Sequence, residues 1–291
     1  MKRFWLAFFI ICTGSAVLGQ AAGSPSPLLR RYREGEKLSY KMKAVNQSRH
    51  YEIEADGVVK KDASGYYEEY AWSQLNTDPP KATLTGASLA FRQPVTLDPN
   101  HPPAMPDLSK VEPAMIGPVT DLMTFYVDLW LAEKTGQLLH AGDHFYFKHG
   151  TAASWADGQY VLLGEDSIDF DLTLKDINQT DNTATLIVRH VVPEKPQIKI
   201  PAEWMRAPVA GTPNNWVQTQ KMPNGKFLAA VGKETFDVEY KLSLADGKIL
   251  SATMDNPVET VERECSDAAL TQCGEQRPRH ILRQVSITLL H

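Results

Sequence analysis

PVTDLMTFYVDLWLAEKT, residues 118–135, is the only long segment of the chain with the clear pattern of an α-helix. Pro118 suits the first helical turn, where its missing N–H would be unpaired, and Gly136 suits a left-handed C-terminal residue. Apolar residues recur at the i, i+3, i+4 spacing of one face and fill much of the remaining girth. The polar residues form only a thin strip: Thr120, Asp121, Thr124 and Asp128. Because a helix this apolar must be covered on most of its girth, we expect a sheet curved around it.

The segments on either side of this helix have the alternating pattern of half-buried β-strands. The expected strands lie at residues 38–45, 51–55, 65–75, 83–97, 144–148, 159–164, 167–177, 183–192, 236–244, 249–253 and 281–290. Short turns separate many of these segments, which favours antiparallel neighbours. The sequence therefore predicts a mainly β fold, in which a strongly curved antiparallel sheet, an unclosed or half barrel, wraps around one long apolar helix.

Two proline-rich passages interrupt the strands. Residues 94–118 contain seven prolines. Since proline cannot donate to a sheet ladder, we interpret this passage as a surface crossover that leads to the helix, with a domain boundary as the alternative. Residues 193–223 include Trp204 and Trp216 and are predicted to form a long loop, a kind of segment that is often functional. Residues 20–291 are thus expected to form a single β-rich domain with two crossovers.

The N-terminus predicts export. Residues 1–19 have the charged start and apolar core of a secretory signal peptide, and the apolar run is too short for a membrane span. Removing Lys2 and Arg3 leaves 28 basic against 35 acidic side chains, a net charge of −7. No basic cluster stands out, so nucleic acid is not an expected partner. No later stretch is apolar enough to cross a bilayer, so the mature chain is not expected to span a membrane.

Cys265 and Cys273 are the two cysteines that remain after removal of the signal peptide. An even pair in an oxidising compartment predicts a disulfide, which here would close a polar loop between two late strands. A redox pair is the alternative, but redox pairs usually show a CxxC spacing.

Signs of catalysis are weak. His140, His144 and His149 are the only histidine cluster, but Gly142 and the aromatic residues that follow indicate a turn entering a strand. On a strand these side chains would not converge as zinc requires, so we predict surface histidines and no metal site. The sequence has neither a GxSxG elbow nor a glycine-rich phosphate loop, and we predict no cofactor.

Aromatic and large apolar residues form the more informative group. The candidate ligand-binding residues are Trp72, Met123, Tyr126, Val127, Trp130, Phe145 and Phe147. They come from the helix and from strands on both sides of it, so they could line one interior. Two interpretations stay open: a filled core, or an interior with space left on the concave side of the sheet.

The layout resembles the unclosed β-barrels of bacterial envelope proteins, which include periplasmic lipoprotein carriers and related uncharacterised secreted domains. Three features support the resemblance: the export signal, the opening Gly35-Glu36-x-Leu38-x-Tyr40 strand, and a buried helix between two sets of antiparallel strands. The resemblance implies a half-barrel whose hollow shelters acyl chains, with helices as a lid.

Three functions follow as hypotheses. The first is an exported envelope protein that binds a hydrophobic small molecule, lipid or acyl chain in the hollow of the curved sheet. The second is a secreted hydrolase with a site near residues 140–149 or in the 193–223 loop. The third is a structural protein that contacts another envelope protein through edge strands or through the Trp204 and Trp216 loop.

Overall fold

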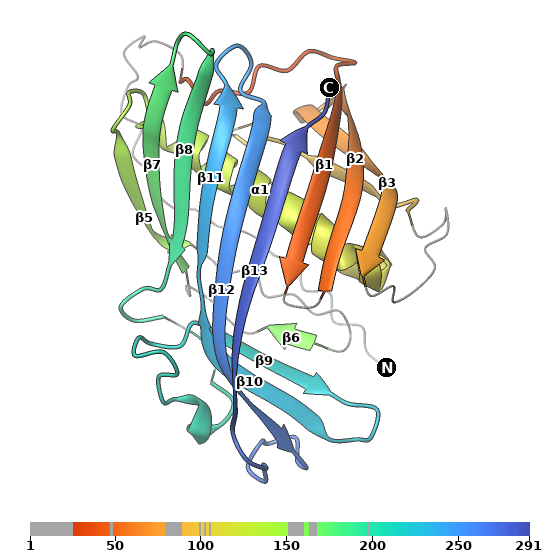
Figure 1. Cartoon of the computed structure of the whole chain (residues 1–291), viewed down its shortest axis with the longest axis vertical. Helices are drawn as coiled ribbons and strands as arrows, with labels where there is room; N and C mark the ends of the chain where they lie inside the picture. The colour runs from red at the N-terminus through yellow and green to blue at the C-terminus, as the bar shows by residue number, and fades with distance from the viewer. Residues whose placement is uncertain are drawn as a thin grey trace.

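One antiparallel sheet of thirteen strands forms the body of the protein, and a long helix lies across one face of it (Figure 1). The computed structural model describes residues 26–46, 49–78, 89–98, 100–101, 103–104, 106–150, 160–162, 168–196, 198 and 200–291. The predicted signal peptide, residues 1–19, and residues 83–88 of the predicted strand segment 83–97 lie outside these residues.

The strands are β1 (Lys37–Asn46), β2 (Arg49–Asp62), β3 (Gly65–Asp78), β4 (Arg92–Val95), β5 (His144–Gly150), β6 (Tyr160–Leu162), β7 (Ile168–Asn178), β8 (Thr183–Val191), β9 (Trp216–Lys221), β10 (Phe227–Glu234), β11 (Phe236–Ser243), β12 (Ile249–Cys265) and β13 (Arg277–Leu289). They run in the order β4-β3-β2-β1-β13-β12-β11-β8-β7-β5. Three further strands extend the sheet from β12: β10 pairs with β12, β9 pairs with β10, and β6 pairs with β9. Among the described strands, β4 and β5 end this path without pairing with each other. The predicted mainly β fold with an open antiparallel sheet is therefore confirmed.

The alternating pattern of the sequence places side chains on the expected faces. Leu38, Tyr40 and Met42 of β1 are buried, and their polar neighbours Lys41 and Lys43 point the other way. Every described strand pair is antiparallel, as short turns between alternating segments require. The last two predicted strands, 249–253 and 281–290, start or end too late or too early. β12 continues through Pro257 to Cys265, and β13 already begins at Arg277.

The predicted helix is α1 (Ile116–Thr135), and it ends where the sequence indicates. Gly136 has a left-handed φ of 61°, and its N–H donates to the carbonyl oxygen of Glu133. Twelve of the twenty residues of α1 are buried, and Asp121, Asp128 and Glu133 are among them. Apolar contacts are therefore only part of what covers the helix. Within the described residues, no helix has the length and hydropathy that a bilayer crossing requires.

Buried residues form two hydrophobic clusters. The larger one lies between α1 and the sheet. The smaller one packs under β9, β10 and β12, at the lower end of the molecule in Figure 1. Its buried members are Ala202, Met205, Val217, Ala229, Val231, Cys265 and Leu270.

This second cluster corrects the prediction of a long loop at residues 193–223. The segment contains a short 3-10 helix, Glu203–Met205, and the whole of β9. Met205 and Val217 are fully buried in the cluster. The loop prediction fails for two reasons. Prolines flank these elements, and the apolar surface that the elements cover belongs to β10 and β12. The first passage, residues 94–118, similarly includes the end of β4 and two 3-10 helices, Leu108–Lys110 and Pro113–Met115.

The predicted disulfide is confirmed. The sulfur atoms of Cys265 and Cys273 are bonded at 2.00 Å, and the bridge closes the loop between β12 and β13. Replacing both cysteines by serine is expected to lower the free energy of unfolding by about 2–3 kcal/mol, since the bridge limits the unfolded chain. Urea denaturation with and without a reducing agent would measure this. An oxidised wild type that is no more stable than the double variant would contradict the prediction.

Candidate functional site

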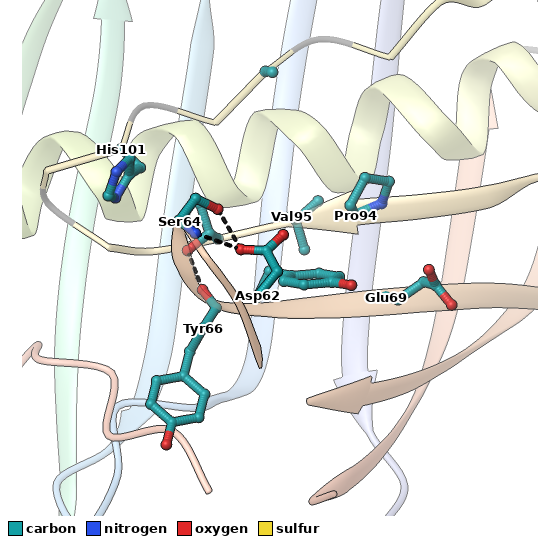
Figure 2. Close-up of a pocket in the computed structure, with 10 residues that line it drawn as sticks. Asp62, Ser64, Tyr66, Glu69, Pro94, Val95 and His101 are labelled. Carbon is teal, nitrogen blue, oxygen red and sulfur yellow. Dashed lines mark hydrogen bonds between the residues drawn. The ribbon is translucent and has the colours of Figure 1, made fainter. Parts of the chain in front are cut away.

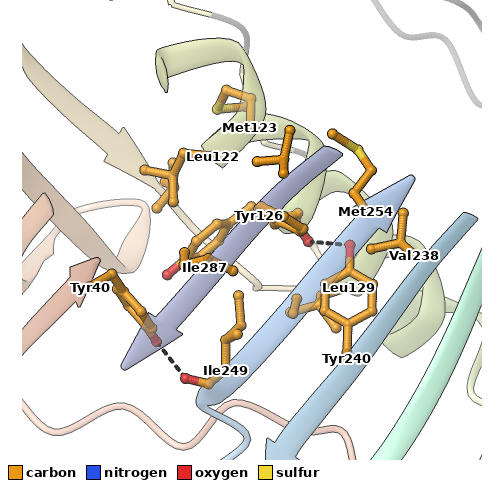
Figure 3. Packing of buried hydrophobic residues seen from close by; sticks show 14 of the residues in the cluster. Tyr40, Leu122, Met123, Tyr126, Leu129, Val238, Tyr240, Ile249, Met254 and Ile287 are labelled. Carbon is orange, nitrogen blue, oxygen red and sulfur yellow. Dashed lines mark hydrogen bonds between the residues drawn. The ribbon is translucent and has the colours of Figure 1, made fainter. Parts of the chain in front are cut away.

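The seven candidate ligand-binding residues belong to one cluster between α1 and the sheet. Trp72, Met123, Tyr126 and Trp130 are buried, and Val127, Phe145 and Phe147 pack against the same cluster while partly buried. Trp72 lies on β3 near one edge of the sheet, and Phe145 and Phe147 lie on β5 at the other. Figure 3 shows Tyr126 packed beside Ile287, with Leu122 and Met123 on the adjacent turn of the helix.

A buried charged network fixes the middle of α1 to the sheet. Glu68 of β3 is 1 % exposed and accepts hydrogen bonds from Arg30 Nε at 2.8 Å, from the Tyr70 hydroxyl at 2.9 Å and from the Tyr126 hydroxyl. Arg30 also donates to Glu36 at 2.9 Å. Burial raises the pKa of both tyrosines well above the ordinary range, and the Glu68 carboxylate raises it further. Both phenols therefore stay protonated and act as donors.

Two carboxylates of the helix itself, Asp121 and Asp128, also have partners on the sheet. Asp128 Oδ1 lies 2.6 Å from Nε2 of His190, and its Oδ2 accepts a hydrogen bond of 2.8 Å from the Tyr240 hydroxyl. Asp121 accepts a hydrogen bond of 2.5 Å from the Tyr51 hydroxyl and forms an ion pair with Arg283. These contacts reach β8, β11, β2 and β13, so α1 is anchored along most of its length. In the sequence, Asp121 and Asp128 stand out only as members of a thin polar strip, and these partners cannot be recognised.

Two buried polar atoms beside the candidate residues have no hydrogen-bond partner in the described structure. They are the indole N–H of Trp72 and the side-chain carbonyl oxygen of Gln93. Gln93 of β4 pairs with Tyr70 of β3, so Trp72 is its diagonal neighbour on the same face. The amide nitrogen of Gln93 donates to the Val119 carbonyl oxygen at 3.0 Å, which fixes the amide against the first turns of α1. An unmatched donor and an unmatched acceptor thus lie near each other at the seam between β4 and the helix.

A surface pocket of about 410 Å³ lies at the turn between β2 and β3 (Figure 2). Its lining residues are Asp62, Ser64, Tyr66, Tyr67, Glu69, Pro94, Val95, Thr96, His101 and Ala104. Sequence reasoning did not find it, because three separate segments form it. The turn residues 62–65 between two alternating strands were the available signal.

The predicted hydrolase sites do not converge in the described structure. His144 Nε2 lies 2.6 Å from Asp171 Oδ1, whereas His140 Nδ1 lies 3.4 Å from Asp143 Oδ2, so the two imidazoles have different partners. The side chain of His149 lies outside the described residues. Among the described residues, no three His, Cys, Asp or Glu side chains are grouped so that they could hold a metal ion.

The tryptophans of the 193–223 segment have structural contacts. The indole N–H of Trp204 donates to the Leu270 carbonyl oxygen at 3.1 Å, and the Arg263 guanidinium lies 5.2 Å from its ring centroid. Trp216 is half-buried at the start of β9. Trp204 therefore packs against the second cluster, and Trp216 pairs with Gly232 of β10.

No protein-family model matches the chain, and no curated protein matches it significantly.

Proposed function

We propose that this chain is an exported protein of the cell envelope that binds a hydrophobic ligand, such as an acyl chain, between α1 and the hollow of the curved sheet. The sequence pattern of a signal peptide supports export. The gathering of aromatic and large apolar residues in one cluster beneath the helix supports an apolar ligand. The resemblance to unclosed envelope barrels points in the same direction.

The observation that carries the proposal is the unmatched pair at Trp72 and Gln93. An unsatisfied buried donor or acceptor costs about 1–3 kcal/mol, so proteins rarely leave two together. A ligand with an apolar chain and a polar end would satisfy both atoms, and an ordered water would satisfy them when no ligand is bound. The pair therefore marks one end of the proposed site.

Ligand entry is expected at the seam between β4 and α1. β4 has only four residues and forms one end of the sheet, so it is the easiest strand of this region to displace. A hydrogen bond from Gln93 to Val119 lies across this seam. The contacts of Asp121 and Asp128 with the sheet lie elsewhere on α1, and they keep the helix in place while the edge opens.

Met123→Trp tests the proposal, because Met123 is buried in the cluster next to the proposed site. If the ligand occupies space there, the added indole fills it, and binding of a fluorescent fatty-acid analogue weakens at least ~10-fold with little loss of stability. Titration of the probe and urea denaturation of the same variant measure both quantities. Val45→Trp is the matched control, since Val45 is exposed on the other face of β1.

The opposite pattern would end the proposal. In a filled core the indole overpacks its surroundings and costs about 1–3 kcal/mol. A wild-type protein that binds no probe, together with a destabilised Met123→Trp variant, would leave α1 as plain core.

A further inference from the structure

The surface pocket has a defined arrangement of charges on the outer face of the sheet. Asp62, Lys60, Tyr67 and Glu69 share this face, because β2 and β3 pair Lys60 with Tyr67 and Asp62 with Gly65. Tyr67 is therefore the diagonal neighbour of Asp62, and Pro94 of β4 lies opposite Glu69. The phenol ring of Tyr66 points away from Asp62 and Ser64 in Figure 2, and the Tyr66 backbone carbonyl accepts a hydrogen bond from Thr96.

Asp62 is the one lining carboxylate that forms no ion pair within hydrogen-bonding distance in the described structure. Glu69 is paired with Lys60 at 2.6 Å. His101 is next to Asp98, with 2.9 Å between Nδ1 and Oδ2. No lysine or arginine is among the described residues that line the pocket. Among the described residues, the pocket thus has one carboxylate, Asp62, that forms no ion pair with a lysine or arginine side chain.

The carboxylate of Asp62 is held in place and ionised. Its Oδ1 accepts hydrogen bonds from the Ser64 backbone N–H at 2.8 Å and from the Ser64 hydroxyl at 2.5 Å. These hydrogen bonds lower the pKa of Asp62 below its ordinary value. Both go to the same oxygen, and the side chain of Asp62 is exposed, so a ligand can reach it.

We propose that this pocket binds a small organic cation, with its ammonium group between the Asp62 carboxylate and the ring of Tyr67. A fixed carboxylate beside an aromatic face suits an ammonium ion, which the ring attracts through its negative face. An anion would meet Asp62 with no cationic partner. A neutral sugar would not neutralise the charge of Asp62. This site is separate from the apolar one beneath α1 and does not depend on it.

Isothermal titration calorimetry of the purified protein at low ionic strength tests the proposal, with choline and ethanolamine as cations. Acetate and glucose serve as the anionic and neutral probes. We expect both cations to bind, affinity to fall as salt screens the charge, and neither acetate nor glucose to give measurable heat.

Asp62→Asn is the decisive variant, because its side-chain carbonyl still accepts both hydrogen bonds from Ser64 and only the charge is lost. Choline affinity is expected to fall at least ~10-fold in this variant, and several-fold in Tyr67→Leu. Asp237→Asn is the control, since Asp237 is an exposed carboxylate on β11 that pairs with Arg189 away from the pocket. Circular dichroism confirms that each variant is folded.

The ammonium group could belong to a soluble amine or to a lipid headgroup. Co-sedimentation with phosphatidylethanolamine vesicles, with phosphatidylglycerol vesicles for comparison, separates these two sources. Binding to either cation source that depends on Asp62 supports the proposal. Equal binding by wild type and Asp62→Asn, preference for acetate or glucose, or no binding to choline, ethanolamine and the vesicles would overturn it. None of these results bears on the apolar site.

Discussion

Replacing Arg30 by methionine is expected to lower the free energy of unfolding by about 3–5 kcal/mol, because it leaves the Glu68 carboxylate buried without its cation. The side chains of Arg30 and Glu68 are each 1 % exposed, so water cannot take over the lost contact. Tyr70 and Tyr126 would still donate to Glu68, but two phenols do not neutralise a charge. Urea denaturation of the variant and the wild type measures the change.

A double-mutant cycle makes this prediction specific. Glu68→Met alone leaves Arg30 with Glu36, its other partner at 2.9 Å, so we expect a smaller loss than in Arg30→Met. In the double variant no unpaired charge stays buried, and its loss is expected to be smaller than the sum of the two single losses by at least ~1 kcal/mol. Additive losses, or a loss below ~1 kcal/mol in Arg30→Met, would contradict a structural role for this network.

The network also joins the N-terminal segment to the rest of the fold. Arg30 precedes β1, Glu68 lies on β3 and Tyr126 lies on α1. The backbone N–H of Arg31 donates to the carbonyl oxygen of Asp246, in the turn between β11 and β12. Loss of the Arg30 charge is therefore expected to loosen contacts among four elements that lie far apart in the sequence.

The elements that local pattern decides were predictable from the sequence. The apolar spacing of residues 118–135 and the glycine after them located α1 to within two residues at its N-terminus. Strict alternation located strands such as β1, β7 and β11. In each case the signal depends on residues a few positions apart, so one sequence is sufficient to detect it.

The missed elements depend on partners distant in the sequence. β9 and β10 are strands because the far end of β12 pairs with β10 and the second cluster covers them. Pro257 is tolerated inside β12, although proline usually indicates the end of a strand. No local pattern distinguishes these segments from loops.

The same limit applies to the polar groups. Asp128 and His190 are 62 positions apart, and Arg30 and Glu68 are 38 apart, so sequence alone could not pair them. The candidate apolar residues were easier to find, because large aromatic side chains in a helix and its flanking strands tend to share a core. The Met123→Trp experiment tests whether a ligand occupies that interior.

Glu133, near the end of α1, is unlike the other buried carboxylates of the helix. It is 7 % exposed, and no side chain of the described structure donates a hydrogen bond to its carboxylate. Burial raises its pKa from the ordinary value of 4.5 to about 8, and the nearby Asp98 carboxylate adds to this, while the backbone N–H of Arg30 opposes it only in part. At neutral pH the folded protein therefore keeps this group protonated.

Glu133→Gln is accordingly expected to stabilise the protein at high pH and to leave it nearly unchanged at low pH. Below pH 4.5 the carboxyl group is protonated in both the folded and unfolded states, so wild type and variant should differ by less than ~1 kcal/mol. Between pH 4.5 and 8 the unfolded chain releases a proton that the folded protein keeps, and the wild type loses stability as pH rises. At about 1.4 kcal/mol per pKa unit, discounted for partial solvent access, the variant should be more stable by about 2–4 kcal/mol at pH 9.

Urea denaturation of wild type and Glu133→Gln from pH 4 to pH 9 measures this difference directly, because contributions from all other titrating groups cancel in the comparison. Glu275→Gln is the matched control: Glu275 is exposed in the loop before β13, so its substitution should give a difference that stays near zero at every pH. The difference for Glu133→Gln should rise between pH 5 and pH 8 and level off above. A difference that stays constant across this range would mean that the carboxylate finds water or a partner in the folded protein, and that burial does not hold its proton.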